Sequence, residues 1–374
     1  MSRALALFAL LCLAACDSGS EPPPPTPPPP AEDEVVAGVN LTRLFASPTA
    51  AERDSVRAVW DVREAERTNR YAYGEVARGE GDAGETLIVV SGRLAEEPGE
   101  PVVHHLLIRV PPRAPGDARP LPVLFVSPQE REASPEAFFT SSVTPTLRDE
   151  VAQVLVGWRG GAVVALGQRF GSALPASPYD ADADDALAAQ AALPGVDGIP
   201  FTLDFGRSAW AGRGRGGTVA LLASARSSQP DAAVSWAAPT SFFLPTVLAD
   251  TCRMLRGGDP SALPGFDGVY REAVFPIRGD SAALAAARRE FLLRSPLYFS
   301  DLLPPTFLIH SPADAVVPAE HAAALDGRLP DPEPLGFARY AFPEQSEQPG
   351  HAGTFSYEDG LRTAERFLAY HLGL

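Results

Sequence analysis

Residues 208–223, which read SAWAGRGRGGTVALLA, contain the pattern that decides the fold. The apolar run from Ala209 to Gly212 predicts a short strand, and the run that opens at Thr218 predicts the first turns of a helix. Glycines stand between the two runs, where they let the backbone turn sharply and let a strand and a helix pack closely. The stretch therefore predicts a strand, a tight turn and a helix in direct succession.

The glycine spacing matches a nucleophile elbow, G-x-S-x-G, in which a strained turn raises a serine above the end of a strand. Gly212 and Gly216 occupy the glycine positions, Gly217 follows, and Gly214 stands where the pattern has serine. Glycine cannot attack a carbonyl carbon, although it relieves the strain of the turn. Moving the elbow to Ser208 is the alternative, but it misplaces the glycines. The sequence predicts a hydrolase scaffold without its nucleophile.

Composition is typical of a globular protein and argues against a nucleic-acid partner. The 374 residues are 45% hydrophobic and 21% charged, enough for one large α/β domain with appendages. A net charge of -16 repels phosphates. After Cys12 and Cys16 the body keeps only Cys252, which excludes an internal disulfide. No two histidines share a metal-ligand spacing with a nearby acid, so we expect no metal and no other cofactor.

Residues 1–15 predict a cleaved leader. Arg3 gives a positive start, and the apolar run behind it is too short for a permanent membrane span. The run ends in Leu-Ala-Ala before Cys16, which resembles the lipobox of bacterial lipoproteins, where the leader is cut before the cysteine and the thiol is lipidated. An ordinary secretory signal is the alternative. Acyl chains on Cys16 would bind the lipid bilayer, so we expect a bacterial envelope protein on the periplasmic face or the cell surface.

Two segments precede the main domain. Residues 16–38 form a linker that contains the proline run 22–30, and this run predicts a stiff polyproline II spacer that rises about 3.1 Å per residue. A proline-rich ligand for a partner domain is the alternative. Residues 39–84 are interpreted as a helical segment, because Val56, Val59, Trp60 and Val62 give a partial apolar face. We expect it to pack on the outside of the main domain.

From residue 85 to the end, strand and helix patterns alternate, which predicts a mostly parallel sheet with helices on both faces. The expected strands are 85–90, 102–110, 121–126, 161–166, 209–212, 232–237, 305–310 and 338–342, the first two as an antiparallel pair with a turn at 96–100. The expected helices are 146–158, 184–193, 215–226 and 354–371. The alternation stops at about 241–299, so this insertion, with a helix at 280–293, is expected to cover the carboxyl ends of the strands as a lid.

This order resembles the α/β-hydrolase fold and, within it, the catalytic domain of the prolyl oligopeptidase family of serine peptidases. The resemblance covers 85–374 and is carried by GRGRGG at 212–217, AVSWAAPT at 233–240, RSPL at 294–297, PTFLIH at 305–310 and ADAVVP at 313–318. It implies that Asp314, in its D-x-x-V-P setting, is the triad acid and that His351, after Gly350, is the triad base. Esterases and dienelactone-type hydrolases share much of this pattern.

The resemblance also implies an oxyanion hole made of backbone N–H groups. Arg215 would supply one, and the other would come from the loop after the third strand, which reads Val-Ser-Pro-Gln at 126–129. Pro128 has no N–H, which leaves Ser127 or Gln129 in place of the usual glycine-rich turn. Loss of a triad serine costs on the order of a million-fold in turnover. With the hole altered as well, we expect no measurable peptidase turnover.

Two other histidines are interpreted as structural. His310 belongs to a predicted strand and His371 lies near the chain end. His104 and His105 are adjacent, so they point to opposite faces of a strand, and one of them is expected to be exposed.

Three functions fit these observations. The first is a catalytically impaired hydrolase that binds a small-molecule, ester or peptide ligand, or a partner, under its lid. The second is an active serine hydrolase, peptidase or esterase, that uses another nucleophile such as Ser127 or Ser208. The third is an interaction or scaffold protein of the cell envelope with a pocket filled by side chains. An open cleft lined by Phe242 or Phe243 near the predicted acid and base would favour the first.

Overall fold

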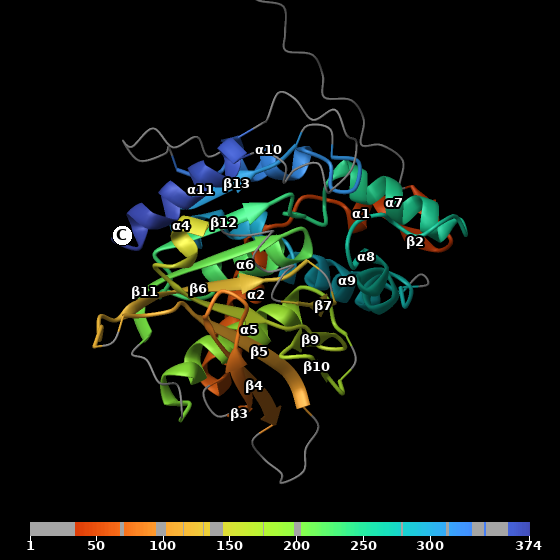
Figure 1. Cartoon of the computed structure of the whole chain (residues 1–374). Helices are drawn as coiled ribbons and strands as arrows, with labels where there is room; N and C mark the ends of the chain where they lie inside the picture. The colour runs from red at the N-terminus through yellow and green to blue at the C-terminus, as the bar shows by residue number, and fades with distance from the viewer. Residues whose placement is uncertain are drawn as a thin grey trace, which may run out of the picture. The chain divides into compact units, whose positions relative to one another are not determined.

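In the computed structural model of this chain, nine strands among the described residues form one sheet in the order β14-β13-β12-β11-β6-β8-β5-β4-β3 (Figure 1). Six neighbouring strands, β14, β13, β12, β11, β6 and β8, pair in parallel. The other three, β5, β4 and β3, pair antiparallel, β5 with β8 and β4, and β4 with β3. The mostly parallel sheet and the antiparallel first pair are thus confirmed. The strands are β3 (Tyr71–Glu80), β4 (Thr86–Leu94), β5 (Val102–Val110), β6 (Leu121–Ser127), β8 (Ala152–Val156), β11 (Leu203–Arg213), β12 (Ala232–Trp236), β13 (Thr306–Ile309) and β14 (Tyr340–Ala341).

The structure describes residues 34–67, 71–94, 102–114, 116–129, 131–134, 145–174, 176–197, 203–277, 280–311, 314–330, 340–341 and 358–374. Residues 33–374 form one compact unit. The predicted leader, Cys16, the proline run, the 96–100 turn and His351 lie outside the described residues. Among the helices that are described, none combines the length and the apolarity that crossing a bilayer requires.

Helices cover both faces of the sheet. In β6, Val123 and Phe125 join one core cluster and Leu124 and Val126 join the other, because side chains alternate along a strand. The first cluster includes α2 (Ala50–Arg67), α5 (Asp180–Ala192) and α6 (Arg215–Ala225), and the second includes α4 (Pro145–Arg148) and α11 (Glu358–His371). Figure 1 shows β3 and β4 in orange at the opposite end of the sheet from β13 and α11 in blue.

The insertion after β12 contains α7 (Pro245–Leu255), α8 (Phe266–Val269), a π-turn (Tyr270–Val274), α9 (Ser281–Leu293) and a 3-10 segment (Pro296–Leu302). In Figure 1 its three helices gather beside α1 (Leu41–Leu44), which follows the small hairpin of β1 (Val35–Val36) and β2 (Val39–Asn40). Phe242, Phe266 and Phe291 are fully buried in the same cluster as Trp60 and Trp210. The insertion is therefore packed into the main core.

Residues 146–158 do not form the predicted helix. The short helix α4 ends at Arg148, and residues 152–156 form β8, which lies between β6 and β5. All five residues of β8 are buried. Burial on both faces of a sheet favours a strand for the run Ala-Gln-Val-Leu-Val.

Two further predictions about which residues belong to the main sheet are wrong. The strand predicted at 161–166 exists as β9 (Ala162–Ala165), but it pairs with β10 (Gln168–Gly171) and β7 (Glu132–Ala133) in a separate three-stranded sheet. The segment 39–84 is not all helical, because β3 belongs to the main sheet and pairs with β4. Within α2, Val56 and Trp60 are buried as expected, whereas Val62 is 60% exposed.

Candidate functional site

Gly214 lies in the turn between β11 and α6, with φ 53° and ψ -122°. Such angles are costly for a residue that carries a side chain. The N–H of Gly214 donates to the carbonyl of Trp236 at 2.8 Å, and the carbonyl of Gly214 accepts the N–H of Thr218 at 3.2 Å. The turn is thus fixed between the end of the neighbouring strand and the first turn of the helix.

The glycines around this turn are required by close approach. A Cβ on Gly212 would lie 2.2 Å from the carbonyl oxygen of Gly216, and a Cβ on Gly216 would lie 2.1 Å from that of Ser127. A Cβ on Gly217 would lie 2.8 Å from the hydroxyl of Ser235. The strand end, the loop after β6 and the helix therefore meet at distances that only glycine permits.

The oxyanion candidates gather around the same turn. Ser127 ends β6, lies opposite Gly212 in the parallel register and is 3% exposed, while Gln129 is half-buried two residues further on. Arg215 is the first residue of α6, which has no side-chain cap. The first N–H groups of a helix have no acceptor within it. The loop after β6 and the first turn of α6 thus lie in contact.

Asp314 lies in the turn after β13, and its side chain is fully buried. Its Oδ1 accepts the N–H groups of Val316 and Val317, both at 2.9 Å. Its Oδ2 lies 3.8 Å from Nε2 of His310, and that nitrogen donates to the carbonyl of Val317 at 2.7 Å. The carboxylate is therefore held by its own turn, and His310 fixes that turn, which agrees with a structural role for His310.

Backbone hydrogen bonds bring the elbow and Asp314 to one edge of the sheet. The N–H of Gly214 donates to the carbonyl of Trp236, the last residue of β12. In the same way, the N–H of Ala237 donates to the carbonyl of Ile309, the last residue of β13, at 2.9 Å. The carboxyl ends of β11, β12 and β13 are therefore joined side by side, with Gly214 after the first and Asp314 after the third. His351, predicted to complete this site, lies outside the described residues.

His321, at the start of α10 (Glu320–Asp326), was missed by the sequence reasoning. Its Nδ1 accepts the N–H of Thr240 at 3.1 Å, and the hydroxyl of Thr240 donates to the carbonyl of His321 at 2.6 Å. Complete burial, together with a smaller effect of the neighbouring His310, lowers the pKa of His321 to about 3. This neutral histidine fixes the chain where it leaves β12 and enters the insertion.

The side chain of Arg215 was also missed. Its Nη2 and Nε lie 2.6 and 3.0 Å from Oδ2 of Asp182, and its guanidinium stacks 4.1 Å above the ring of Trp158. Burial raises the pKa of Asp182 to about 6, although Arg215 acts in the opposite direction. The acidic run DADADD at 180–185 was the available signal, since acidic residues favour the first turn of a helix.

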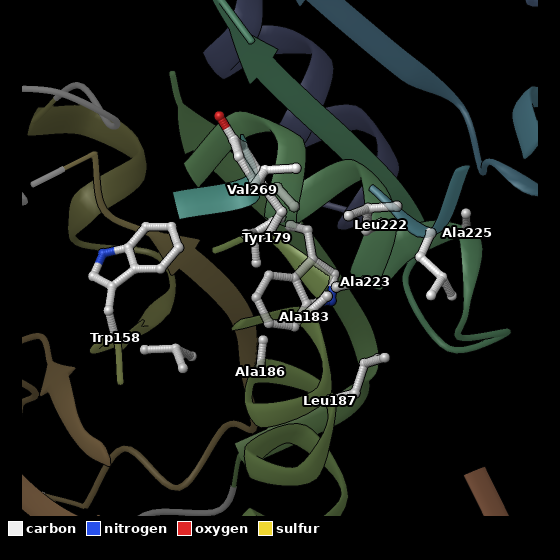
Figure 2. Packing of buried hydrophobic residues seen from close by; sticks show 14 of the residues in the cluster. Trp158, Tyr179, Ala183, Ala186, Leu187, Leu222, Ala223, Ala225 and Val269 are labelled. Atoms are coloured by element: carbon white, nitrogen blue, oxygen red, sulfur yellow. The ribbon is translucent and has the colours of Figure 1, made fainter. Parts of the chain in front are cut away.

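The other aspartates of α5 are paired in the same way. Asp180 and Asp184 bind both Arg63 and Arg226, with Arg63 at 2.8 and 3.0 Å, and Asp185 binds Arg159. The thirty-one Lys and Arg residues of the chain are all arginines. The planar guanidinium suits buried pairs with carboxylates. This network stabilises the helix layer behind the elbow; Figure 2 shows the apolar residues of α5 and α6 packed within that layer.

The expectation that one of His104 and His105 is exposed is wrong. They are 0% and 7% exposed, because α5 covers one face of the sheet here and the β9–β10 hairpin covers the other. His104 Nε2 lies 3.0 Å from the hydroxyl of Tyr73, and the ring of His105 lies 5.6 Å from that of Phe170. Burial lowers the pKa of both histidines, that of His105 to about 4.

Three other side chains that the sequence suggested for the site are buried in the interior. Ser208 is fully buried in β11, six residues before Gly214, which corresponds to about 20 Å along a strand. Phe242 and Phe243 are 0% and 9% exposed, so they fill the core and do not line an open cleft. In the described part of the chain, no group of three or more His, Cys, Asp and Glu side chains is placed to hold a metal ion.

No protein-family model matches this sequence, and no curated protein does. Two solved acetyl xylan esterases, each 13% identical, share its architecture. That of Paenibacillus sp. R4 has a TM-score of 0.57 over 88% of this chain and 98% of its own, and esterase 1 of Thermoanaerobacterium sp. JW/SL YS485 has 0.55 over 87% and 99%. A Mycobacterium tuberculosis puromycin-hydrolyzing peptidase, 18% identical, has a TM-score of 0.46 over 80% of this chain and 46% of its own. The chain has the α/β-hydrolase fold, as its element order predicted.

Proposed function

We propose that this protein is a lipid-anchored envelope protein, related to the prolyl oligopeptidase family, that binds a ligand or partner at the carboxyl edge of its sheet without hydrolysing it. Ligands of open α/β sheets bind at this edge. Esters belong among the candidates with peptides and other small molecules, because the similar structures include acetyl xylan esterases. The lipobox-like end of the leader at Cys16 supports the anchor.

The geometry of Gly214 carries the proposal. The strand, the tight turn and the helix of an elbow surround this residue, yet it offers no hydroxyl to a substrate. Asp314 is held by two backbone N–H groups, in the manner of an acid that orients a base. A frame of this kind without a nucleophile supports binding more than turnover, because removal of a triad serine costs on the order of a million-fold in rate.

The test restores the hydroxyl. Full-length protein in detergent and its Gly214→Ser variant are treated with a fluorophosphonate probe, and the intact mass is measured. We expect the natural protein to stay unlabelled and the variant to gain one adduct at residue 214. Gly214→Ala and the double variant Gly214→Ser/Asp314→Asn serve as controls. The first should not label, and the second should label far more slowly, because the base loses its orienting acid.

An adduct on the natural protein would contradict the proposal and support an active hydrolase. Ser127 would then be the residue to inspect, because it ends β6 next to the elbow, whereas Ser208 lies in the interior of β11. A natural protein and a serine variant that both stay unlabelled would support the scaffold alternative instead. The burial of Phe242 and Phe243 is the observation that favours that alternative.

A further inference from the structure

The insertion touches the rest of the fold at Pro178 and Tyr179, just before α5. The hydroxyl of Tyr179 donates to the carbonyl of Pro264, and Nε of Arg294 donates to the carbonyl of Pro178 at 3.1 Å. A Cβ on Gly268 would lie 2.9 Å from Cγ of Pro178. Two hydrogen bonds and one close approach thus dock the middle of the insertion and its last part on this short segment.

The backbone of Tyr179 is strained. It has φ 70° and ψ -71° and is fully buried. A bulky residue with positive φ is a genuine outlier, and such strain costs about 1–3 kcal/mol and persists only where the surroundings over-determine it. Here the ring packs 5.1 Å from that of Phe242, and Figure 2 shows Tyr179 next to Val269 of the insertion.

One oxygen joins this strained residue to the elbow. Oδ2 of Asp182 accepts the N–H of Tyr179 at 2.7 Å and also binds the guanidinium of Arg215, the residue after Gly214. The aliphatic part of Arg215 returns to the insertion, since its Cδ lies 3.6 Å from the position of a Cβ on Gly265. A continuous path of contacts therefore runs from Pro264 through Tyr179 and Asp182 to the first turn of α6.

We infer that Tyr179 and Asp182 are positioning residues that couple the insertion to the elbow, so that a ligand or partner that displaces Pro264 loosens the first turn of α6. The coupling concerns the fold and goes beyond the proposed function. It holds whether or not Gly214 marks a lost nucleophile. In an active hydrolase with this arrangement, the coupling would set the position of the oxyanion donor. In this protein, the coupling would change the first turn of α6 when a ligand or partner binds at the carboxyl edge of the sheet.

Protonation of Asp182 gives the coupling a pH dependence. The groups that face this carboxyl are Arg215 from α6, Tyr179 from the preceding segment, Asp185 from its own helix, and Arg159 from the segment after β8. The carboxylate is ionised above about pH 6 and becomes protonated as the pH falls through that value. Because burial raises the pKa, protonation favours the buried arrangement over an opened one in which the carboxyl is solvated, so the elbow and the insertion should tighten together below pH 6.

Hydrogen exchange on the full chain tests the coupling with matched variants. Asp182→Asn and Tyr179→Phe are compared with Asp180→Asn, a similarly buried acid in the same helical turn that pairs with Arg63 and Arg226. We expect Asp182→Asn to raise exchange about tenfold in both 214–222 and 264–274, and Tyr179→Phe to raise it in 264–274 and, less, in 214–222. Asp180→Asn should leave both segments unchanged.

A change confined to one of the two segments, or the same pattern in Asp180→Asn, would overturn the inference. If Asp182→Asn fails to fold, the natural protein at pH 5 and pH 7 provides the second measurement, after correction for intrinsic exchange rates. Joint slowing of exchange in both segments at pH 5 that is reduced in Tyr179→Phe supports the coupling, and exchange that is independent of pH in both contradicts it. None of these readouts depends on labelling at residue 214.

Discussion

Arg288 of α9 and Glu52 of α2 form a two-point ion pair, with Nε 2.7 Å from Oε1 and Nη2 2.9 Å from Oε2. The remaining nitrogen, Nη1, donates to the carbonyls of Arg43, Leu44 and Ala46 at the end of α1. The hydrogen bonds from Arg288 lower the pKa of Glu52 to about 2. One guanidinium thus joins the N-terminal helices to the insertion.

Replacement of Arg288 by alanine should reduce the free energy of unfolding by about 2–4 kcal/mol, because it removes the one group that donates to three backbone carbonyls and to both oxygens of a carboxylate. Urea denaturation measures the change. The neighbouring Arg289, exposed on the same helix, is the control, and Arg289→Ala should stay within about 0.5 kcal/mol of the natural protein. Equal effects of the two substitutions would show that the ion pair does not stabilise the fold.

Gly216→Ala should destabilise the protein by more than about 3 kcal/mol. Its Cβ would lie 2.1 Å from a backbone oxygen that ends β6, so the strand or the helix has to move. Gly195→Ala is the matched control, because nothing lies within 4 Å of its Cβ position. Thermal unfolding followed by circular dichroism compares the two. A Gly216→Ala variant as stable as the control would mean that the elbow is less tightly packed than the structure indicates.

The sequence alone predicted the elbow because its signals are local. Glycine spacing at 212–217 and apolar runs on either side are enough to define a strand, a turn and a helix. The same holds for β12 and β13, whose short apolar runs were read correctly. The turn that holds Asp314 was found through its D-x-x-V-P pattern, which also lies within a few residues.

Features that depend on distant residues were missed. Residues 152–156 become a strand because β6 and β5 flank them, and no nearby residue reveals this. Arg63 pairs with Asp180 across 117 positions of sequence, so the network behind the elbow leaves no periodic pattern. His104 and His105 are both buried because separate elements cover the two faces of their strand. Long-range packing decides these cases.

Gly214→Ser should lower the free energy of unfolding by about 1–3 kcal/mol. A serine at φ 53° and ψ -122° is strained, whereas glycine adopts these angles freely. Urea denaturation of the variant used for labelling measures this cost. Gly195→Ser, at a position without positive φ, should cost less than half as much. If the serine variant is as stable as the natural protein, Gly214 does not relieve backbone strain at this turn.

Buried histidines should make the protein less stable in weak acid. The pKa of His321 is lowered to about 3 in the folded state, so the unfolded chain binds a proton more readily between about pH 6.5 and pH 3. The free energy of unfolding therefore falls as the pH falls through that range. Asp182, with its raised pKa, acts in the opposite sense between about pH 4 and pH 6.

His321→Asn isolates this contribution, because the amide oxygen of asparagine can still accept the N–H of Thr240 but does not titrate. Unfolding is measured in urea from pH 4 to pH 7.5. The variant should lose less stability than the natural protein between pH 6.5 and pH 4.5, whatever its stability at pH 7.5. Parallel curves for the two proteins would assign the acid sensitivity to other groups.

The proposed lipid anchor can be tested by chemical labelling of primary amines. The chain has no lysine, so its α-amino group is the only primary amine. If the leader is cut before Cys16 and both the thiol and the new amino group are acylated, protein extracted from bacterial membranes should not react with an amine-reactive ester. Its mass should be that of residues 16–374 plus the acyl groups. Cys16→Ser should remain uncleaved and react once, at its first residue. A natural protein that reacts once and carries no added mass would rule out lipidation, since an ordinary secretory signal leaves its new amino group free.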